Sequence, residues 1–517
     1  MYPIEQANDQ VRVREVLLPM SDGTKLYTRI SMPAIGERFP IVFIRTPYEK
    51  SHEGQPHSID ACAADPCIRH GYAVVWQHCR GEGDSEGVCI PYGDKERTDG
   101  LDTLEHIRRM DIYNGEIYLC GASYLSTVHL LYLNTRPADI KGAVLAIQTD
   151  RMYFRNYRNG CPYRFCNFDW FMSMMRRQYP NATMQGNTQR PFIEMSERIF
   201  GEQVDCVHQM FEHDTYDQFW QSDPRTDVME HIDFPVLWVE GWQDYYIEGM
   251  FSMWERMKPQ AKAQSAMLVG PWGHATHVCD NDLPLPNGNL PADHIPMWFD
   301  HIRTGQPFAP AKLGQVNYYS IGADEWMTDE QETQPMRLCL SADQTLGDVP
   351  TAGELSYRYD PQIRHNRFPF GAIKACEAGR TDEGILTFYS QPFTKERRFY
   401  GRPRWHMAVR SSRHNTAFFV RLYLRRDGKD YNLTETITSL SHLNPDYHAE
   451  DTQMIDLPLP PIGFTVKPGD AIRVDISSDG GAYVPNSNTR GHWAYVTKTQ
   501  VATNTVICGE VSFIEIP

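Results

Sequence analysis

The chain has 517 residues, of which 41% are apolar and 12% aromatic, enough for more than one buried core. Its formal net charge of −16 at pH 7 argues against nucleic acid or an anionic membrane as a partner, because phosphate groups attract basic surfaces. We therefore expect a soluble acidic enzyme built from two or three domains.

The cysteine pattern and the amino terminus bear on location and metal binding. Residues 1–6 show no basic segment followed by an apolar core, so we expect no secretory signal. No apolar run approaches the roughly 18 residues of a membrane span. The twelve cysteines include no Cys-x-x-Cys, and neither Cys62/Cys67 nor Cys161/Cys166 has a companion histidine pair. We expect free thiols in the cytoplasm, no metal site and no cofactor.

The first 80 residues predict the start of a sheet. Residues 11–19 and 25–30 resemble two strands joined by a Ser-Asp-Gly turn. The continuous apolar runs 40–44 and 72–76 are typical of central strands in a parallel sheet covered on both faces. The first of them leads to Tyr48 at its carboxyl end, where open α/β sheets place their sites.

A glycine-rich segment and a helix follow. Residues 81–87 are as rich in glycine as a phosphate-binding loop, but they lack the Lys-Ser/Thr ending and no apolar helix follows directly. We therefore reject phosphate binding there. Glu96, Asp99 and residues 101–109 predict an amphipathic helix that leads toward the next strand.

The segment around Ser123 carries the first candidate for chemistry. An apolar strand is predicted at 117–120 and a buried helix at 127–133, with Gly121-Ala122-Ser123 between them. Strand, Gly-x-Ser turn and helix are the setting of a nucleophile elbow, which exposes a serine hydroxyl above the sheet. A lone Gly-x-Ser is usually an ordinary turn, so this hypothesis needs an acid and a histidine further along.

Both residues follow at predicted strand ends. Residues 234–241 predict a buried strand with Asp244 directly after it, and residues 267–270 predict another that leads to His274. The order serine, aspartate, histidine is that of α/β-hydrolases. A neutral imidazole titrates near pH 7 and can take the serine proton, while a carboxylate fixes its tautomer and stabilises the imidazolium.

Between these strands the composition changes over residues 149–230, where aromatic and methionine side chains crowd together. We interpret this segment as a helical cap inserted between sheet strands. Such a stripe is more typical of a core than of a pocket, although a cap above an elbow also lines adaptable apolar sites. The candidate substrate-binding residues are Trp170, Phe171, Tyr245 and Trp272.

The last 200 residues contain many short predicted strands with turn signals between them. They include 315–321, 337–340, 416–424, 465–466 and 471–477. This pattern is typical of a β-sandwich.

The sequence resembles the cocaine esterase and X-Pro dipeptidyl-peptidase family of serine hydrolases (CocE/NonD hydrolases). The resemblance rests on five strings that span most of the first 300 residues: Thr46-Pro47-Tyr48, Arg80-Gly81-Glu82-Gly83-Asp84-Ser85-Glu86-Gly87, Gly121-Ala122-Ser123-Tyr124, Gly241-Trp242-Gln243-Asp244 and Gly270-Pro271-Trp272-Gly273-His274. It implies an α/β class fold: an α/β-hydrolase domain (1–148 and 231–305), a helical cap (149–230) and a carboxyl-terminal jelly-roll β-sandwich (306–517).

The resemblance also implies roles for single residues. Ser123 would be the nucleophile, Asp244 the acid and His274 the base. The backbone N–H of Tyr124 supplies one oxyanion donor by elbow geometry, and the Tyr48 hydroxyl would supply the other. The family's glycine-rich segment is a structural loop, in which we expect Arg80 to bind carboxylates.

Two positions depart from the family pattern. Ser126 stands where the family usually has glycine, and His78 where it usually has aspartate. Serine is still small, so we expect the elbow to form. The departures favour one competing class, a catalytically inactive binding protein on the same fold. Metal-assisted hydrolysis, a further class, lacks a His-Glu-x-x-His ligand set.

The substrate class is argued from charge. Family members that act on α-amino acyl groups hold the ammonium with carboxylates, whereas here Glu248 is the first acid after Asp244. Asp169 and Glu194 from the cap are left open as alternatives. We expect a carboxylesterase for acyl groups without a free α-amine, with X-Pro peptide cleavage as the runner-up. The expected partner is a small ester or short peptide, and self-association as a homodimer is left open.

Overall fold

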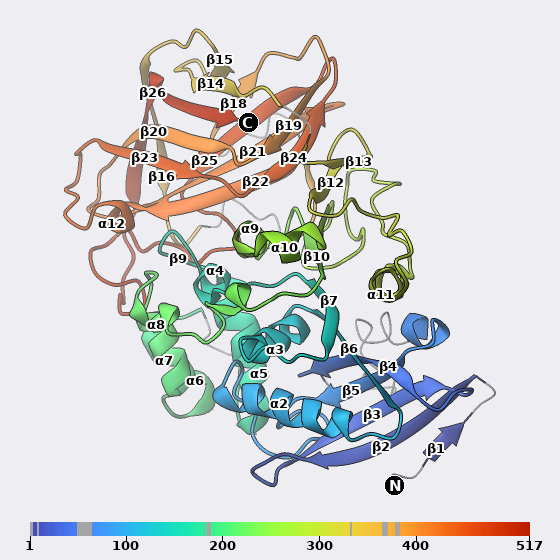
Figure 1. Ribbon diagram of the computed structural model, residues 1–517. Coiled ribbons are helices and arrows are strands. Elements are labelled where there is room, and N and C mark those ends of the chain that lie inside the picture. The colour runs from blue at the N-terminus through green and yellow to red at the C-terminus, as the bar shows by residue number, and fades with distance from the viewer. Residues whose placement is uncertain are drawn as a thin grey trace.

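The computed structural model of the protein describes residues 4–7, 10–48, 65–179, 181–183, 188–330, 333–363, 371–377 and 383–517. Two large β-sheets dominate it (Figure 1). The first sheet (blue to yellow-green) carries helices on its faces, the cap helices (green) lie to one side, and the second sheet (orange and red) forms the carboxyl-terminal part.

Among the described residues the first sheet has eleven strands, in the order β1-β2-β3-β5-β4-β6-β7-β10-β11-β12-β13. Their bounds are β1 Ile4–Ala7, β2 Val11–Pro19, β3 Lys25–Pro33, β4 Phe39–Thr46, β5 Ala73–His78, β6 Tyr113–Ala122, β7 Ile140–Ala146, β10 Val236–Gly241, β11 Ala266–Gly270, β12 Val316–Ser320 and β13 Glu325–Thr328. The strands from β5 to β12 pair in parallel. β4 is buried along its whole length, as a strand covered on both faces must be.

Helices cover both faces of this sheet. They are α2 Asp94–Arg108, α3 Tyr124–Leu133, α9 Ile247–Arg256, α10 Pro259–Ala263 and α11 His294–Thr304. Side chains of α2, α3 and α9 join one apolar core, and Trp298 and Phe299 of α11 join the core on the opposite face. Every residue of α3 is buried, which explains its continuous apolar sequence. This is the predicted α/β-hydrolase arrangement.

The predicted cap is helical. Its elements are α4 Met152–Asn156, β8 Tyr157–Arg158, β9 Cys161–Pro162, the π-helix η1 Phe165–Trp170, α5 Phe171–Met175, η2 Arg176–Gln178, η3 Phe192–Glu194, α6 Met195–Phe200, α7 Asp205–Glu212, α8 Gln218–Gln221 and η4 Val228–Glu230. Most of its aromatic and methionine side chains form a core of their own. Ala494 and its neighbour Trp493, from the carboxyl-terminal region, pack into that core.

The carboxyl-terminal part is built almost entirely from strands. They are β14 Met336–Leu340, β15 Thr345–Gly347, β16 Gly353–Tyr359, β17 Ala375–Glu377, β18 Leu386–Ser390, β19 Arg397–Gly401, β20 Arg404–Ser411, β21 Ala417–Arg426, β22 Lys429–Ser439, β23 Gln453–Pro458, β24 Ile462–Val466, β25 Ala471–Ser477 and β26 Ala502–Ile516, with one short helix, α12 Leu440–Leu443. The fold is thus an α/β-hydrolase domain with a cap, followed by a jelly-roll β-sandwich.

One predicted strand lies in the other sheet. Residues 315–321 were expected in the sandwich, but β12 pairs in parallel with β11 and β13 pairs with β12. Strand length and turn signals do not specify a partner strand, and here the partner is the edge of the first sheet. The predicted limits of the three domains stay predictions.

Two further observations concern cysteines and membranes. The cysteines in the described residues are free thiols, and Cys62 lies outside that part of the chain. Within the same residues, no helix has the length and apolar character needed to cross a membrane.

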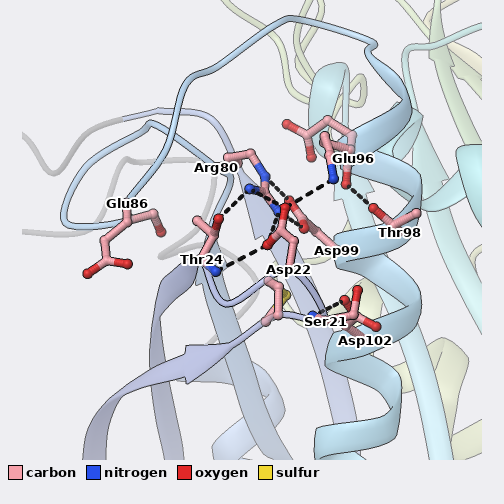
Figure 2. A network of polar contacts seen from close by, with 12 residues as sticks. Ser21, Asp22, Thr24, Arg80, Glu86, Glu96, Thr98, Asp99 and Asp102 are labelled. Carbon is pink, nitrogen blue, oxygen red and sulfur yellow. Dashed lines mark hydrogen bonds and ion pairs between the residues drawn. The ribbon is translucent and has the colours of Figure 1, made fainter.

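Arg80 ties three separate segments together (Figure 2). Its guanidinium makes a bidentate contact with Asp99 of α2, with Nη2 to Oδ1 at 2.5 Å and Nε to Oδ2 at 2.9 Å. It also binds Asp22 and Thr24 in the turn between β2 and β3. Asp99 is completely buried. The predicted carboxylate contacts of Arg80 are present, and the glycine-rich loop after β5 is thereby fixed to both neighbours.

We predict that Arg80→Met lowers the free energy of unfolding by about 3 kcal/mol, because it leaves the buried Asp99 carboxylate without its cation. Thermal unfolding followed by circular dichroism measures this loss. Lys95→Met is the matched control, since the Lys95 ammonium contacts the same Asp22 but its side chain is 62% exposed. Equal melting temperatures for Arg80→Met and wild type would contradict the prediction.

Candidate active site

The predicted strand–turn–helix around Ser123 is present. β6 ends at Ala122, Ser123 has φ 57° and ψ −125°, and α3 begins at Tyr124. A positive φ is strained for a residue with a side chain and persists only where the surroundings enforce it. Here the Ser123 N–H donates to the Ala146 carbonyl of β7 at 2.9 Å. A Cβ at Gly121 would overlap the backbone of Leu125, so only glycine allows the turn to close.

Ser126, the first departure from the family pattern, fits this turn. Its hydroxyl donates to the Gly121 carbonyl at 2.6 Å and accepts the Ala146 N–H at 3.0 Å. The side chain is completely buried and both of its roles are satisfied. A serine in place of glycine therefore adds two hydrogen bonds to the elbow without opening it.

His78, the second departure, packs beneath the glycine-rich loop. Its ring lies 4.5 Å from the Trp76 ring and 5.2 Å from the Tyr27 ring, and its Nδ1 accepts the Asp84 N–H at 3.3 Å. A side chain at Gly83 would overlap the imidazole. His78 thus packs against the glycine-rich loop 81–87 and accepts a hydrogen bond from its backbone.

The acid and the histidine reach the same edge of the sheet as Ser123. β10 and β11 run in parallel with Gly241 opposite Gly270, and Asp244 and His274 follow these two residues. β7 lies between β6 and β10 and pairs with both. Since the carboxyl ends of parallel strands meet at one edge, residues more than a hundred positions apart come together.

The three side chains form one hydrogen-bonded line. His274 Nε2 lies 2.8 Å from Ser123 Oγ, and His274 Nδ1 lies 2.6 Å from Asp244 Oδ2. Asp244 is completely buried, and its Oδ1 accepts the Tyr246 N–H at 2.7 Å. The His274 side chain keeps 29% of its surface exposed, so it faces the solvent side of the site.

The two predicted oxyanion donors lie close together, because Tyr48 packs against the small cluster that contains Tyr124, the residue after Ser123. Tyr48 is half-buried two residues beyond β4, and the Trp170 indole N–H donates to its hydroxyl at 3.4 Å. Accepting a hydrogen bond polarises a hydroxyl and makes it a better donor. Tyr124 is anchored by its side chain, whose hydroxyl donates to the buried Glu96 carboxylate at 3.2 Å.

The four predicted substrate-binding residues separate into two groups. Tyr245 stacks on the His274 ring with 4.8 Å between centroids, and Trp170 contacts Tyr48. Trp272 is completely buried in a core of the first domain, and Phe171 is 3% exposed within the cap core. The structure therefore brings Tyr245 to His274 and Trp170 to Tyr48 and Tyr124, and it leaves Trp272 and Phe171 in apolar cores.

Glu240, a residue that the sequence analysis did not single out, lies beneath the triad. It is completely buried on β10, its Oε1 accepts the Gly241 N–H at 2.8 Å, and its Oε2 has no hydrogen-bond partner among the residues that the structure describes. Burial, together with the nearby Asp244 carboxylate, raises the pKa of Glu240 well above its ordinary value. An acid directly after the apolar string 236–239, within the predicted strand, was the available sequence signal.

Arg155 is the second residue that sequence reasoning missed. Its buried guanidinium lies 4.6 Å from the Trp170 ring centroid and 5.3 Å from that of Tyr92. It donates to the Asn156 side chain and the Cys166 carbonyl. The Arg155 cation therefore packs against the ring of Trp170, the residue that contacts Tyr48.

Metal binding has no geometric support among the described residues, where no group of three or more His, Cys, Asp or Glu side chains is arranged around a common point.

Comparisons with known proteins agree with this architecture. Residues 22–276 match the model of the family described as X-Pro dipeptidyl-peptidase (S15 family), and residues 306–512 match that of the X-Pro dipeptidyl-peptidase C-terminal non-catalytic domain. The cocaine esterase of Rhodococcus sp. (strain MB1 Bresler) is 22% identical over 542 aligned positions, covering 92% of each chain.

Two solved structures share the fold over almost the whole chain. An α-amino acid ester hydrolase superposes with a TM-score of 0.83 at 22% identity, covering 99% of this chain and 98% of its own. A CocE/NonD family hydrolase from Staphylococcus aureus superposes with a TM-score of 0.68 at 16% identity, covering 98% and 94%. The chain therefore belongs to the CocE/NonD family, with its X-Pro dipeptidyl-peptidase (S15) catalytic and carboxyl-terminal domains, and it is a hydrolytic enzyme of the serine hydrolase type.

Proposed function

We propose that the protein hydrolyses carboxylic esters of small molecules through an acyl-enzyme, with Ser123 as nucleophile, His274 as base and Asp244 as the orienting acid. The observation that carries the proposal is the line of two hydrogen bonds, 2.8 Å from Ser123 to His274 and 2.6 Å from His274 to Asp244. Nucleophile, base and orienting group within hydrogen-bond reach are the signature of an activated serine.

The reaction follows from the donors and acceptors of this line. His274 Nε2 takes the hydroxyl proton as Ser123 Oγ bonds to the ester carbonyl carbon, and then gives that proton to the departing alcohol oxygen. Water repeats the sequence on the acyl-enzyme, releasing the acid and restoring Ser123. Asp244 holds the Nδ1 proton and stabilises the imidazolium between these steps.

The negative charge on the carbonyl oxygen needs donors in place before the reaction. We propose the Tyr124 N–H and the Tyr48 hydroxyl, since each such donor is worth roughly 10²–10³ in rate. Trp170 supports this role because its indole N–H donates to the Tyr48 oxygen. The Tyr48 hydroxyl proton then points away from Trp170 and can be donated to the carbonyl oxygen of the substrate.

The ion pairs around the site support an ester without a free amine. Glu248 contacts Arg158 at 3.1 Å and also pairs with Arg402. Glu194 pairs with Arg198 at 3.3 Å and Asp169 lies 3.9 Å from Arg164. Each of the three acids considered for a substrate ammonium therefore already faces an arginine. A buried ammonium without a carboxylate is costly, and the cation of Arg155 behind Trp170 adds repulsion.

The charge of the triad depends on Glu240. With two carboxyl groups buried close together, one of them holds a proton at neutral pH. The raised pKa of Glu240 means that its carboxyl favours the protonated, neutral form. We propose that Glu240 is a neutral neighbour of the orienting acid, so that it adds no second negative charge beside Asp244.

We predict that Ser123→Ala and His274→Ala each reduce ester hydrolysis by several orders of magnitude while leaving the circular-dichroism spectrum unchanged.

For Tyr48→Phe we expect a loss of about 10²-fold in kcat with little change in KM, because the hydroxyl binds the oxyanion rather than the ground state. Initial rates on p-nitrophenyl acetate measure all three. Ser173→Ala, at an exposed cap position, is the control. Turnover within tenfold of wild type in Ser123→Ala would sink the assignment.

The choice between ester and X-Pro peptide is tested by substrate competition. We predict that kcat/KM for p-nitrophenyl acetate exceeds that for Ala-Pro p-nitroanilide with a free amino terminus by at least about 10²-fold, since an unpaired ammonium is strongly disfavoured. Loss of both activities in Ser123→Ala shows that one site is responsible. A preference for the Ala-Pro amide would make the protein an X-Pro dipeptidyl-peptidase instead.

For Glu240 we predict a pH-dependent stability. Below about pH 4.5 the carboxyl is protonated in both the folded and the unfolded chain, so the proton does not affect folding. Above that value the unfolded chain releases a proton that the folded chain retains, and wild type loses stability as the pH rises. The melting temperature of Glu240→Gln minus that of wild type should therefore increase from pH 5 to pH 8.

The matched control is Glu37→Gln, which removes one negative charge from an exposed position. Its difference from wild type should stay constant over the same range. A constant difference between wild type and Glu240→Gln from pH 5 to pH 8 would contradict the prediction and show that Glu240 ionises in the folded protein as it does in the unfolded chain.

A further inference from the structure

Beside the triad lies a cavity of about 670 Å³ that the proposed chemistry has not used. Its volume is within the 300–1,000 Å³ of pockets that enclose small organic ligands. It lies on the face of the first sheet that α11 covers, opposite the face that carries α3 and α9. Neither Trp170 nor Tyr245, two of the four candidate substrate-binding residues, is among the described residues that line it.

The walls of the cavity are mainly apolar. The carboxyl-terminal ends of the central strands form one wall through Ala122, Val144, Ala146 and Val239. Leu290 and the first turn of α11 form another. Charged groups gather toward the outside, where Arg69 and Asp293 pair at 2.9 Å and are 60% and 40% exposed. The interior therefore suits an uncharged apolar group, and the ion pair lies on the solvent side.

The position of His274 fixes which side of Ser123 the cavity is on. His274 itself and the next three residues, 275–277, are part of the wall. Tyr48 and Tyr124, the proposed oxyanion donors, are not among the described residues that line it. The cavity thus adjoins the triad at its base, His274, and the Tyr48 side chain packs against the apolar cluster that forms its strand wall.

Acyl transfer places the leaving group on that side. When the Ser123–carbonyl bond has formed, the bond from the carbonyl carbon to the alcohol oxygen breaks, and that oxygen takes the proton from His274 Nε2. The alcohol oxygen must therefore come within hydrogen-bond distance of His274, and the group attached to it extends past the imidazole. The carbonyl oxygen points the other way, toward its donors.

We propose that this cavity binds the alcohol half of the substrate, and that the enzyme is selective for esters of bulky, uncharged, apolar alcohols. The inference rests on the proposed function, because it takes His274 as the base that protonates the leaving oxygen. It adds the identity of the group that leaves: a ring-sized or branched apolar alcohol rather than a small or charged one.

Three esters separate the alcohol side from the acyl side. Cyclohexylmethyl acetate and methyl cyclohexylacetate are isomers that carry the same ring on opposite sides of the ester, and methyl acetate carries none. The alcohols of the two acetates are both primary and leave comparably. With acetyl as the common acyl group, differences in kcat/KM report the acylation step.

For wild type we expect cyclohexylmethyl acetate to exceed both methyl esters by at least about tenfold in kcat/KM, the discrimination that an apolar pocket gives. Leu290→Trp and Ile295→Trp fill the cavity from two different elements and should each remove most of that preference. Activity on methyl acetate should stay within about threefold, which also shows that each variant is folded. Leu313→Trp makes the same change at an exposed leucine outside the cavity and should behave as wild type.

Distinct outcomes overturn distinct statements. If the tryptophan variants lose activity on methyl cyclohexylacetate instead, the cavity holds the acyl group and the inference is wrong. Equal losses on all three esters, or no ring preference in wild type, would also overturn it. Absence of any Ser123-dependent hydrolysis of the three esters, in a wild type that cleaves Ala-Pro p-nitroanilide, would refute the proposed ester function itself.

Discussion

Between β6 and α3 the chain reverses so closely that Gly121 faces the backbone of Leu125 and Ser126. The remaining active-site geometry depends on this contact, because it holds Ser123 at a positive φ with its hydroxyl above the sheet edge. The hydrogen bonds of Ser126 to Gly121 and Ala146 fasten the turn to its neighbouring strand. A residue that departs from the family pattern is thus part of what keeps Ser123, the proposed nucleophile, in place.

The loops that carry Asp244 and His274, the proposed acid and base, are supported by the carboxyl-terminal region. The side chain of Gln243, next to Asp244, donates to the Leu433 carbonyl at 2.6 Å and accepts from Asn432 at 2.9 Å. The backbone of Gly273, next to His274, lies so close to Gly371 that a side chain would overlap it. Catalytic groups need outer residues that lock their orientation. Here strands from a domain without triad residues meet that need.

Charge is arranged around the site to favour one ionisation pattern. Glu248 is paired with Arg158 and Arg402, while Glu240 is buried where its ionised form is unfavourable. Burial likewise raises the pKa of Tyr245 well above that of a free tyrosine, so its hydroxyl stays protonated beside His274. The arrangement is consistent with one mobile proton, shared between Ser123 and His274, and with a substrate that carries no ammonium.

The sequence by itself determined the local elements and the order of the chemistry. The apolar runs before Ser123, Asp244 and His274 correspond to β6, β10 and β11, because burial of a central strand requires a continuous apolar sequence. It could not assign β12, since a short strand carries no information about its partner edge. The sequence analysis placed Trp272 at the site, whereas the structure buries it in an apolar core. A tryptophan within a motif has the same sequence signature whether its side chain faces a core or a pocket.

Only the tertiary structure decided what surrounds the triad. Glu240, Arg155 and the cavity beside His274 arise from side chains on strands and helices far apart in the chain. Their burial and proximity are properties of packing, which no local pattern encodes.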